Sequence, residues 1–174
     1  MAFKISKSIT ILERTPTVLY TLLNNLPTEW VMENEGKSTW NAYEVVAHLI
    51  HGEKTDWMVR ATQILTESTD VLFEPFDRFA HLKVKPQLPL NNLLLEFKTL
   101  RATNISTLKK YQLNLNTLQR TGTHPDFGTV TLQELIAAWV VHDLGHLAQI
   151  SRTMAKHYTH FVGPWKAYMG VLNK

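Results

Sequence analysis

Hydrophobic residues recur at helical spacing in four long stretches of the chain, and no stretch shows the strict alternation that is typical of a half-buried strand. The four stretches cover about residues 5–25, 41–67, 90–111 and 131–157. Four helices of this length joined by loops predict an all-α protein with the architecture of a four-helix bundle. We expect one domain that spans residues 1–174.

Local sequence signals mark the ends of the expected helices. Asn41 with Glu44, and Thr131 with Glu134, have the spacing of a capping box, in which side chains and backbone groups of the first turn bond one another. Within the first stretch, Pro16 follows a threonine that can cap a new helical turn, and proline itself suits a first turn. We therefore expect a kink or a break at that point.

The connecting segments differ in their expected roles. Residues 68–70 end the second helix, and the aromatic loop 70–88 follows. This loop is long enough to be a functional lid, although its three phenylalanines could equally cover one end of the core. Residues 122–128, punctuated by glycine and proline, predict a loop, and residues 163–165 begin a short tail that is expected to pack against the bundle.

The composition is that of an ordinary globular protein, with 44% hydrophobic and 19% charged residues. The formal net charge is only +3 and the basic residues are scattered, which argues against nucleic-acid binding. The chain has no cysteine, which excludes disulfides, thiolate metal ligands and a cysteine nucleophile. It also shows no signal peptide and no apolar run of membrane-spanning length, so we expect a cytoplasmic protein without a membrane partner.

Two histidines on the fourth expected helix are the strongest chemical signal in the chain. His142 and His146 are four residues apart, slightly more than one helical turn, so both imidazoles leave the helix on one face. That is the spacing of a pair of metal ligands. His48 on the second helix lies in an apolar neighbourhood that suits a neutral imidazole, and it is a better third donor than His51, which points about 60° away around the helix. The alternative is that these histidines are ordinary polar residues of the bundle or its edge.

Asp143 makes the segment look like the His-Glu-x-x-His motif of zinc proteases with a shorter acid. Because aspartate reaches one carbon less far, we expect Asp143 to pair with a histidine or a neighbouring helix, and treat it as a weak candidate for a general base.

Gln149 and Glu44 could orient a ligand or be solvated. No glutamate stands three residues before any histidine, which argues against a ferritin-like dimetal site. The remaining histidines, expected in loops or near helix ends, are His81, His157, His160 and, at the mouth of the expected pocket, His124.

In their order and spacing, these motifs resemble those of the DinB-like or YfiT-like family of metal-binding four-helix bundles. The resemblance spans nearly the whole chain and is carried by Leu12-x-x-Thr15-Pro16, the segment 39–49, Trp57-x-x-Arg60, Phe76-Asp77-Arg78 and the segment 142–150. It implies that three histidines hold a metal, one on the second helix and two on the fourth, here His48, His142 and His146. It also implies a homodimer as a plausible assembly.

The activity that the resemblance implies is broad, because the family includes thiol-dependent S-transferases, isomerases and hydrolases. Three neutral imidazoles leave a divalent ion with open positions, and such an ion lowers the pKa of bound water or deprotonates a thiol. We expect an enzyme that uses zinc or nickel on a small-molecule substrate, although imidazole also suits copper and iron. The first expectation is an S-transferase that uses a low-molecular-weight thiol such as bacillithiol or glutathione. The alternatives are a hydrolase that uses bound hydroxide and a non-catalytic, metal-stabilised module for binding or dimerisation.

Overall fold

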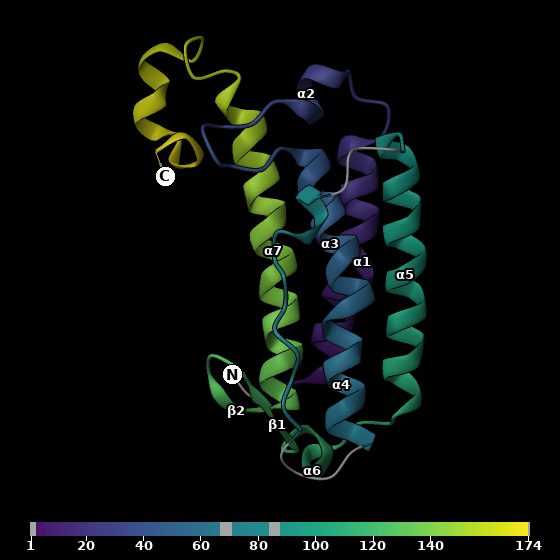
Figure 1. Ribbon diagram of the computed structural model, residues 1–174. Coiled ribbons are helices and arrows are strands. Elements are labelled where there is room, and N and C mark those ends of the chain that lie inside the picture. Colours follow the sequence, from purple (N-terminus) through teal and green to yellow (C-terminus); the bar gives the residue numbers. More distant parts are fainter. Residues whose placement is uncertain (1–2, 67–70, 84–87, 174) are drawn as a thin grey trace.

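The computed structural model of the protein describes residues 3–66, 71–83 and 88–173, which form a bundle of four long helical rods (Figure 1). The rods are, in chain order, α1 Ile5–Leu23, α3 Ala42–Thr55 followed by α4 Trp57–Thr66, α5 Leu90–Lys110, and α7 Leu132–Lys156. The expected all-α four-helix bundle is therefore confirmed. None of the described helices combines the length and the hydropathy that crossing a membrane requires.

Short elements lie in the connections between the rods and in the C-terminal tail. They are α2 Thr28–Met32, η1 Ala80–Lys83, α6 Leu115–Leu118, β1 Thr121–His124, β2 Gly128–Thr131, η2 Gly163–Tyr168 and η3 Gly170–Leu172. The tail lies beside the end of α7 (Figure 1), where Leu172 is buried and its carbonyl accepts a hydrogen bond from Nζ of Lys156 at 3.3 Å. The tail thus contacts α7 mainly through its last turn, whereas residues 163–171, including those expected to begin the packing, are exposed.

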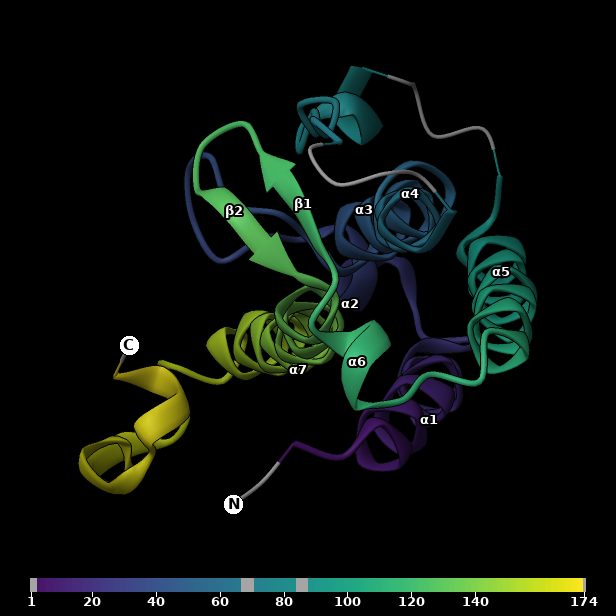
Figure 2. The same cartoon turned by 90° about the horizontal axis from the view of Figure 1, so that it is seen from below.

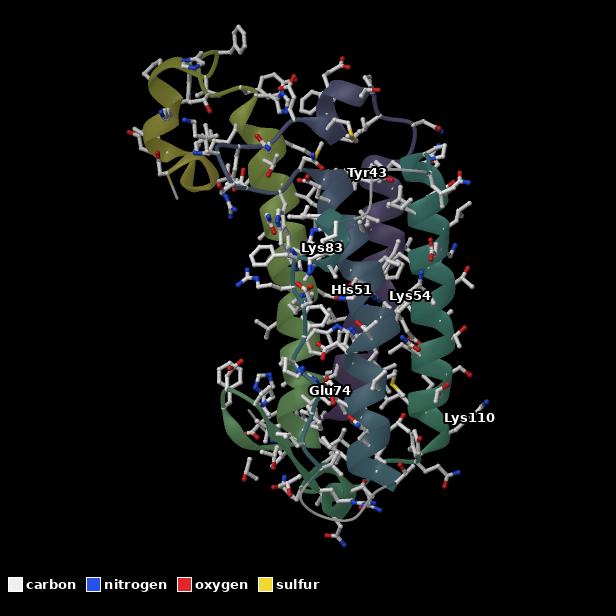
Figure 3. The ribbon with its side chains drawn as sticks, in the orientation of Figure 1. Tyr43, His51, Lys54, Glu74, Lys83 and Lys110 are labelled. Carbon is white, nitrogen blue, oxygen red and sulfur yellow. The ribbon has the colours of Figure 1, made fainter. Side chains whose placement is uncertain are left out.

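Helices that follow one another in the chain are not always neighbours in the bundle. Both α1 and the α3–α4 rod contact α5 and α7, so α1 and α3 lie diagonally across the bundle (Figure 2). Since α4 and α5 run in the same direction (Figure 1), the chain must return along the bundle between them. Residues 71–83 belong to this return segment, which we call the crossover. Figure 3 shows its course: Glu74 lies below His51 of α3, and Lys83 lies above it.

Capping boxes begin two of the rods, as the sequence predicts. Oδ1 of Asn41 accepts from the backbone N–H of Glu44 at 2.9 Å, and Oε2 of Glu44 accepts from the backbone N–H of Asn41 at 3.0 Å. Thr131 and Glu134 form the same arrangement at the start of α7. Of the kink or break expected at Pro16, the break is absent, because α1 continues through this residue without interruption.

The second rod departs from helical geometry at Asp56, where φ is −122° and ψ is −80°. Helical hydrogen bonds nevertheless continue across this point, from Asp56 to the carbonyl of Gly52 at 3.0 Å and from Arg60 to the carbonyl of Asp56 at 2.9 Å. The single helix expected over 41–67 is therefore two helices in line. The end expected for this helix at residues 68–70 lies outside the described residues.

A short antiparallel hairpin occupies most of the stretch expected to be a loop at 122–128. β1 and β2 pair from Thr121 opposite Thr131 to His124 opposite Gly128, which leaves three residues in the turn. Gly128 has a φ of +71°, the left-handed conformation that a three-residue hairpin requires. The crossover extends this hairpin, because Thr123 accepts from the backbone N–H of Phe73 at 2.9 Å and donates to the carbonyl of Val71 at 2.7 Å.

The hydrophobic core consists of two clusters with a polar layer between them. On α5, for example, Phe97 belongs to one cluster and Ile105 to the other, while the buried Arg101 lies between them. The buried residues Glu53 of α3 and Asp143 of α7 occupy the same intermediate position on their helices. Buried polar groups persist only where they are hydrogen-bonded, so this layer must be satisfied by internal partners.

Glycines at positions 122 and 145 provide a matched test of the packing of the crossover. A Cβ at position 122 would lie 2.5 Å from Cζ of the buried Phe73, whereas a Cβ at position 145 in α7 would meet nothing within 4 Å. We expect Gly122→Ala to lower the free energy of unfolding by about 1–3 kcal/mol through overpacking. We expect Gly145→Ala to raise it by about 0.5–1 kcal/mol, because alanine favours a helix interior. Urea denaturation of both variants tests this, and equal effects would contradict the packing described.

Candidate metal centre

The imidazoles of His48, His142 and His146 meet at their Nε2 atoms. Nε2 of His142 lies 3.0 Å from Nε2 of His48 and 3.1 Å from Nε2 of His146. One ring nitrogen from each histidine lies within 4.8 Å of the others, and residues 3–66, 71–83 and 88–173 contain no other such group of three histidines or carboxylates. One donor therefore comes from α3 and two come from successive turns of α7, the combination that the sequence predicts.

The separations of Nε2 of His142 from Nε2 of His48 and of His146 fit a single metal ion. Zinc–imidazole bonds of about 2.0–2.1 Å at a tetrahedral angle place two ligand nitrogens about 3.3 Å apart. Nδ1 of His146 lies 2.9 Å from Oε1 of Gln149, which can only accept, so Nδ1 carries the proton and Nε2 presents a lone pair. Gln149 thus orients the ring of His146 rather than lying free in solvent. A cation at the meeting point would use the lone pairs of all three rings.

Burial keeps the three imidazoles neutral. The pKa of His48 and the pKa of His142 are each lowered to about 3, chiefly because burial disfavours the charged ring and secondarily because the neighbouring histidines repel a second charge. Burial also lowers the pKa of His146. Since metal ions bind the neutral form of imidazole, the donors are in the required state at neutral pH.

A buried arginine fixes the helices that carry these donors. Arg101 of α5 donates from Nε and Nη2 to Oε1 of Glu53 at 3.0 and 2.8 Å. It pairs with both carboxylate oxygens of Asp143, from Nη1 at 2.6 Å and from Nη2 at 3.0 Å. Burial opposes the charge of Arg101, but the two carboxylates more than offset this and its pKa is raised. Arg101 thus joins α5 to α3 and α7.

The same arginine explains why α1 tolerates a proline. Pro16 has no N–H, so the carbonyl of Leu12, four residues earlier, lacks its helical donor. Nη1 of Arg101 donates to this carbonyl at 2.8 Å. With this bond, five hydrogen bonds match the five N–H groups of the guanidinium, and one side chain connects all four rods.

Asp143 is therefore an interhelical ion-pair partner, the commoner of the two roles predicted for it. It is fully buried, both its carboxylate oxygens bond Arg101, and it does not line the cavity beside the histidines. The role of general base, for which it was a weak candidate, has no support from this geometry. Glu44, considered as a group that orients a ligand, instead caps α3.

The three histidines face a cavity of about 530 Å³. Aromatic rings form much of its wall: Trp40, Trp57, Phe73, Phe76 and Phe127. The ring of Trp57 lies edge-on to His142 at 5.1 Å between centroids, and that of Trp40 lies 4.7 Å from His48. His124 lines the cavity as expected, whereas His51 lies outside it and stacks on Phe76 at 4.9 Å. A metal bound by the triad would therefore have its open side toward a space that can admit a small molecule.

The crossover contributes to both the core and the cavity. It therefore combines features of the two alternatives expected for this loop, a cover for the core and a lid over the site. Phe73 is buried in one core cluster, as a cover would be. Phe76 and Arg78 line the cavity, as a lid would. Further along, the ring of His81 lies 4.5 Å from Trp40 and 5.2 Å from His48.

Three residues at or near the cavity, His81, Asp56 and Arg60, were not identified from the sequence as parts of the site. His81 was expected in an exposed loop, yet its pKa is lowered to about 4, mainly by burial. Asp56 and Arg60 line the cavity and form a buried ion pair, with Nε of Arg60 2.7 Å from Oδ1 of Asp56. Burial raises the pKa of Asp56, an effect that Arg60 only partly offsets. An acid and a base four residues apart on an apolar helix were the available signal for this pair.

Asp143→Asn tests the network around Arg101. Removal of one carboxylate leaves the arginine in a buried site with a poorer partner, so we expect the free energy of unfolding to fall by about 3–5 kcal/mol. Glu13→Gln is the matched control, because Glu13 forms an ion pair with Lys109 at 2.6 Å on the exposed surface, where the expected loss is below about 1 kcal/mol. Equal losses in urea denaturation would show that the buried network does not hold the helices together.

Comparisons with known proteins place this geometry in a family. A family model described as the DinB superfamily matches residues 11–150. Among solved structures, the chain is similar to YfiT from Bacillus subtilis, described as "a probable metal-dependent hydrolase with an unusual four-helix bundle topology". The TM-score is 0.75 at 23% identity, over 87% of each chain, which shows a shared fold. No curated protein matches the chain significantly. Because the family model covers most of its length, the chain belongs to the DinB superfamily.

Proposed function

We propose that this protein is an enzyme that uses one divalent metal ion, held by Nε2 of His48, His142 and His146, to act on a small molecule. The observation that carries the proposal is the convergence of three neutral imidazoles at the wall of an open cavity. A structural metal site is typically closed by four protein ligands, whereas a catalytic site keeps a position free. The cavity supports the catalytic alternative over a module that the metal only stabilises.

The reaction we propose first is hydrolysis. When bound, such an ion supplies Lewis-acid chemistry and lowers the pKa of water or of a thiol. The residues of the chain orient the imidazoles: Gln149 fixes the ring of His146, while Trp40 and Trp57 pack against the rings of His48 and His142. The similarity to YfiT, described as a probable metal-dependent hydrolase, supports the same class.

Transfer of a group to an external thiol is the second candidate. The chain has no cysteine, so the thiol would have to enter the cavity as a separate molecule such as bacillithiol or glutathione. A volume of about 530 Å³ lies in the range that accommodates a ligand of that size.

Zinc and nickel remain the proposed metals. The homodimer and the cytoplasmic location stay predictions.

Metal content tests the ligand set. After exposure to zinc or nickel and removal of free ions, we expect one ion per chain in the wild-type protein and far less in His48→Ala and His142→Ala. His51→Ala is the matched control and should retain the ion, because His51 lies outside the triad. Gln149→Ala should weaken metal binding about 10- to 100-fold, since it removes the group that orients His146. Elemental analysis gives the stoichiometry, and a full complement of metal in His48→Ala would refute the ligand set.

Turnover distinguishes the two reactions. We expect metal-free protein to be inactive and to regain activity when zinc or nickel is added. A hydrolase should then act on esters and amides. A transferase should act on electrophiles, and only when bacillithiol or glutathione is present. Activity should be lost in His142→Ala and kept in His51→Ala. Activity that survives metal removal would refute the proposal, and inactivity of the loaded protein in every assay would favour a binding module.

A further inference from the structure

Arg60 is a buried cation in the wall of the same cavity, and its position is tightly fixed. Only 7% of the residue is exposed. Its Nε lies 2.7 Å from Oδ1 of Asp56, its Nη2 donates to the carbonyl of Glu74 at 3.2 Å, and its guanidinium lies over the ring of Phe73 at 5.2 Å. Contacts on three sides therefore hold the planar group in one orientation.

These contacts leave part of the guanidinium unused. Within residues 3–66, 71–83 and 88–173, no residue accepts a hydrogen bond from Nη1 of Arg60. An arginine that is buried, immobilised and adjacent to a cavity is suited to bind a carboxylate or phosphate group, because its donors are already aligned.

The charges around Arg60 permit an anion at this place. Asp56 offsets part of its charge at close range, while Arg78 adds a second cation to the lining. Two other carboxylates line the cavity, but Asp126 is exposed to solvent and Glu134 uses Oε2 to accept from the backbone N–H and the hydroxyl of Thr131, both at 2.8 Å. Solvent screens such exposed charges more strongly than buried ones.

We propose that Arg60 forms a subsite for an oxyanion group of the substrate, a carboxylate or a phosphoryl group, and that the aromatic wall accommodates an apolar body attached to it. The substrate class is then a small anionic molecule whose other end reaches the histidine triad. This assignment of substrate class rests on the proposed function, whereas anion binding at Arg60 itself does not require a metal.

The experiment uses metal-free, full-length protein, so that the probe cannot bind a metal ion instead of Arg60. Phenylacetate and phenylacetamide have the same shape and differ in charge, and they are titrated while the ¹H–¹⁵N NMR signals of the tryptophan indoles and arginine side chains are followed. We expect phenylacetate to bind at least about 10-fold more tightly than phenylacetamide and to shift the signals of Trp57 and Arg60. Phenylphosphonate in place of phenylacetate distinguishes a phosphoryl group from a carboxylate, and acetate alone measures the contribution of the ring.

Variants of the ion pair make the prediction specific. Arg60→Gln should weaken phenylacetate binding about 10- to 100-fold and leave phenylacetamide binding unchanged. Asp56→Asn should strengthen phenylacetate binding, because it removes the competing carboxylate. The double variant Asp56→Asn/Arg60→Gln leaves no unpaired buried charge, so it keeps the test valid if Arg60→Gln fails to fold. Arg14→Gln, at an exposed position of α1 that does not line the cavity, is the control and should bind like the wild type.

Equal binding of phenylacetate and phenylacetamide, or unchanged discrimination in the variants that lack Arg60, would overturn the subsite. Failure of the proposed function gives a different result. If the triad takes up no metal while phenylacetate still binds through Arg60, the metal-dependent reaction is refuted and the oxyanion subsite stands.

Discussion

The arrangement of the four rods depends on one buried cation in the core, Arg101 of α5. The guanidinium of Arg101 binds Glu53 of α3, Asp143 of α7 and the carbonyl of Leu12 in α1, and it lies against the rings of Phe97 and Trp139 at 4.9 and 5.0 Å. Glu53 in turn accepts from the indole of Trp139 at 3.1 Å and the amide of Asn104 at 2.8 Å. A buried ion cluster adds little net stability compared with an apolar core, but it is costly to break, so it restricts the helices to one relative arrangement.

The three histidines come from two different helices, so they can meet at one point only if those helices keep a fixed relative position. Asp143 directly follows His142, and Glu53 lies five residues after His48, so Arg101 fixes α7 and α3 close to the points where the donors leave them. The crossover then completes the site from outside the bundle. Because α4 and α5 run in the same direction, the connection between them has to pass along the rods, and this path brings Phe76 and Arg78 into the cavity wall.

The features that the sequence predicts correctly are those determined within a single helix. The four rods, both capping boxes and the positions of His48, His142 and His146 follow from periodicity and spacing within single helices. The uninterrupted helix through Pro16 does not, because its missing hydrogen bond is replaced by Arg101, 85 residues later in the chain. The hairpin was missed because four-residue strands of threonine and glycine carry little hydrophobic pattern. His81 and the Asp56–Arg60 pair belong to the site only through the diagonal arrangement of the rods and the course of the crossover.

The central claim is that three imidazoles bind one ion and leave part of its coordination sphere open toward the cavity. X-ray absorption spectroscopy of the zinc- or nickel-loaded protein measures this arrangement directly. The account predicts scattering from three imidazole ligands with metal–nitrogen distances of about 2.0–2.1 Å for zinc, together with at least one exchangeable oxygen ligand. A spectrum with fewer than three imidazoles, or with a shell completed by protein ligands alone, would contradict it.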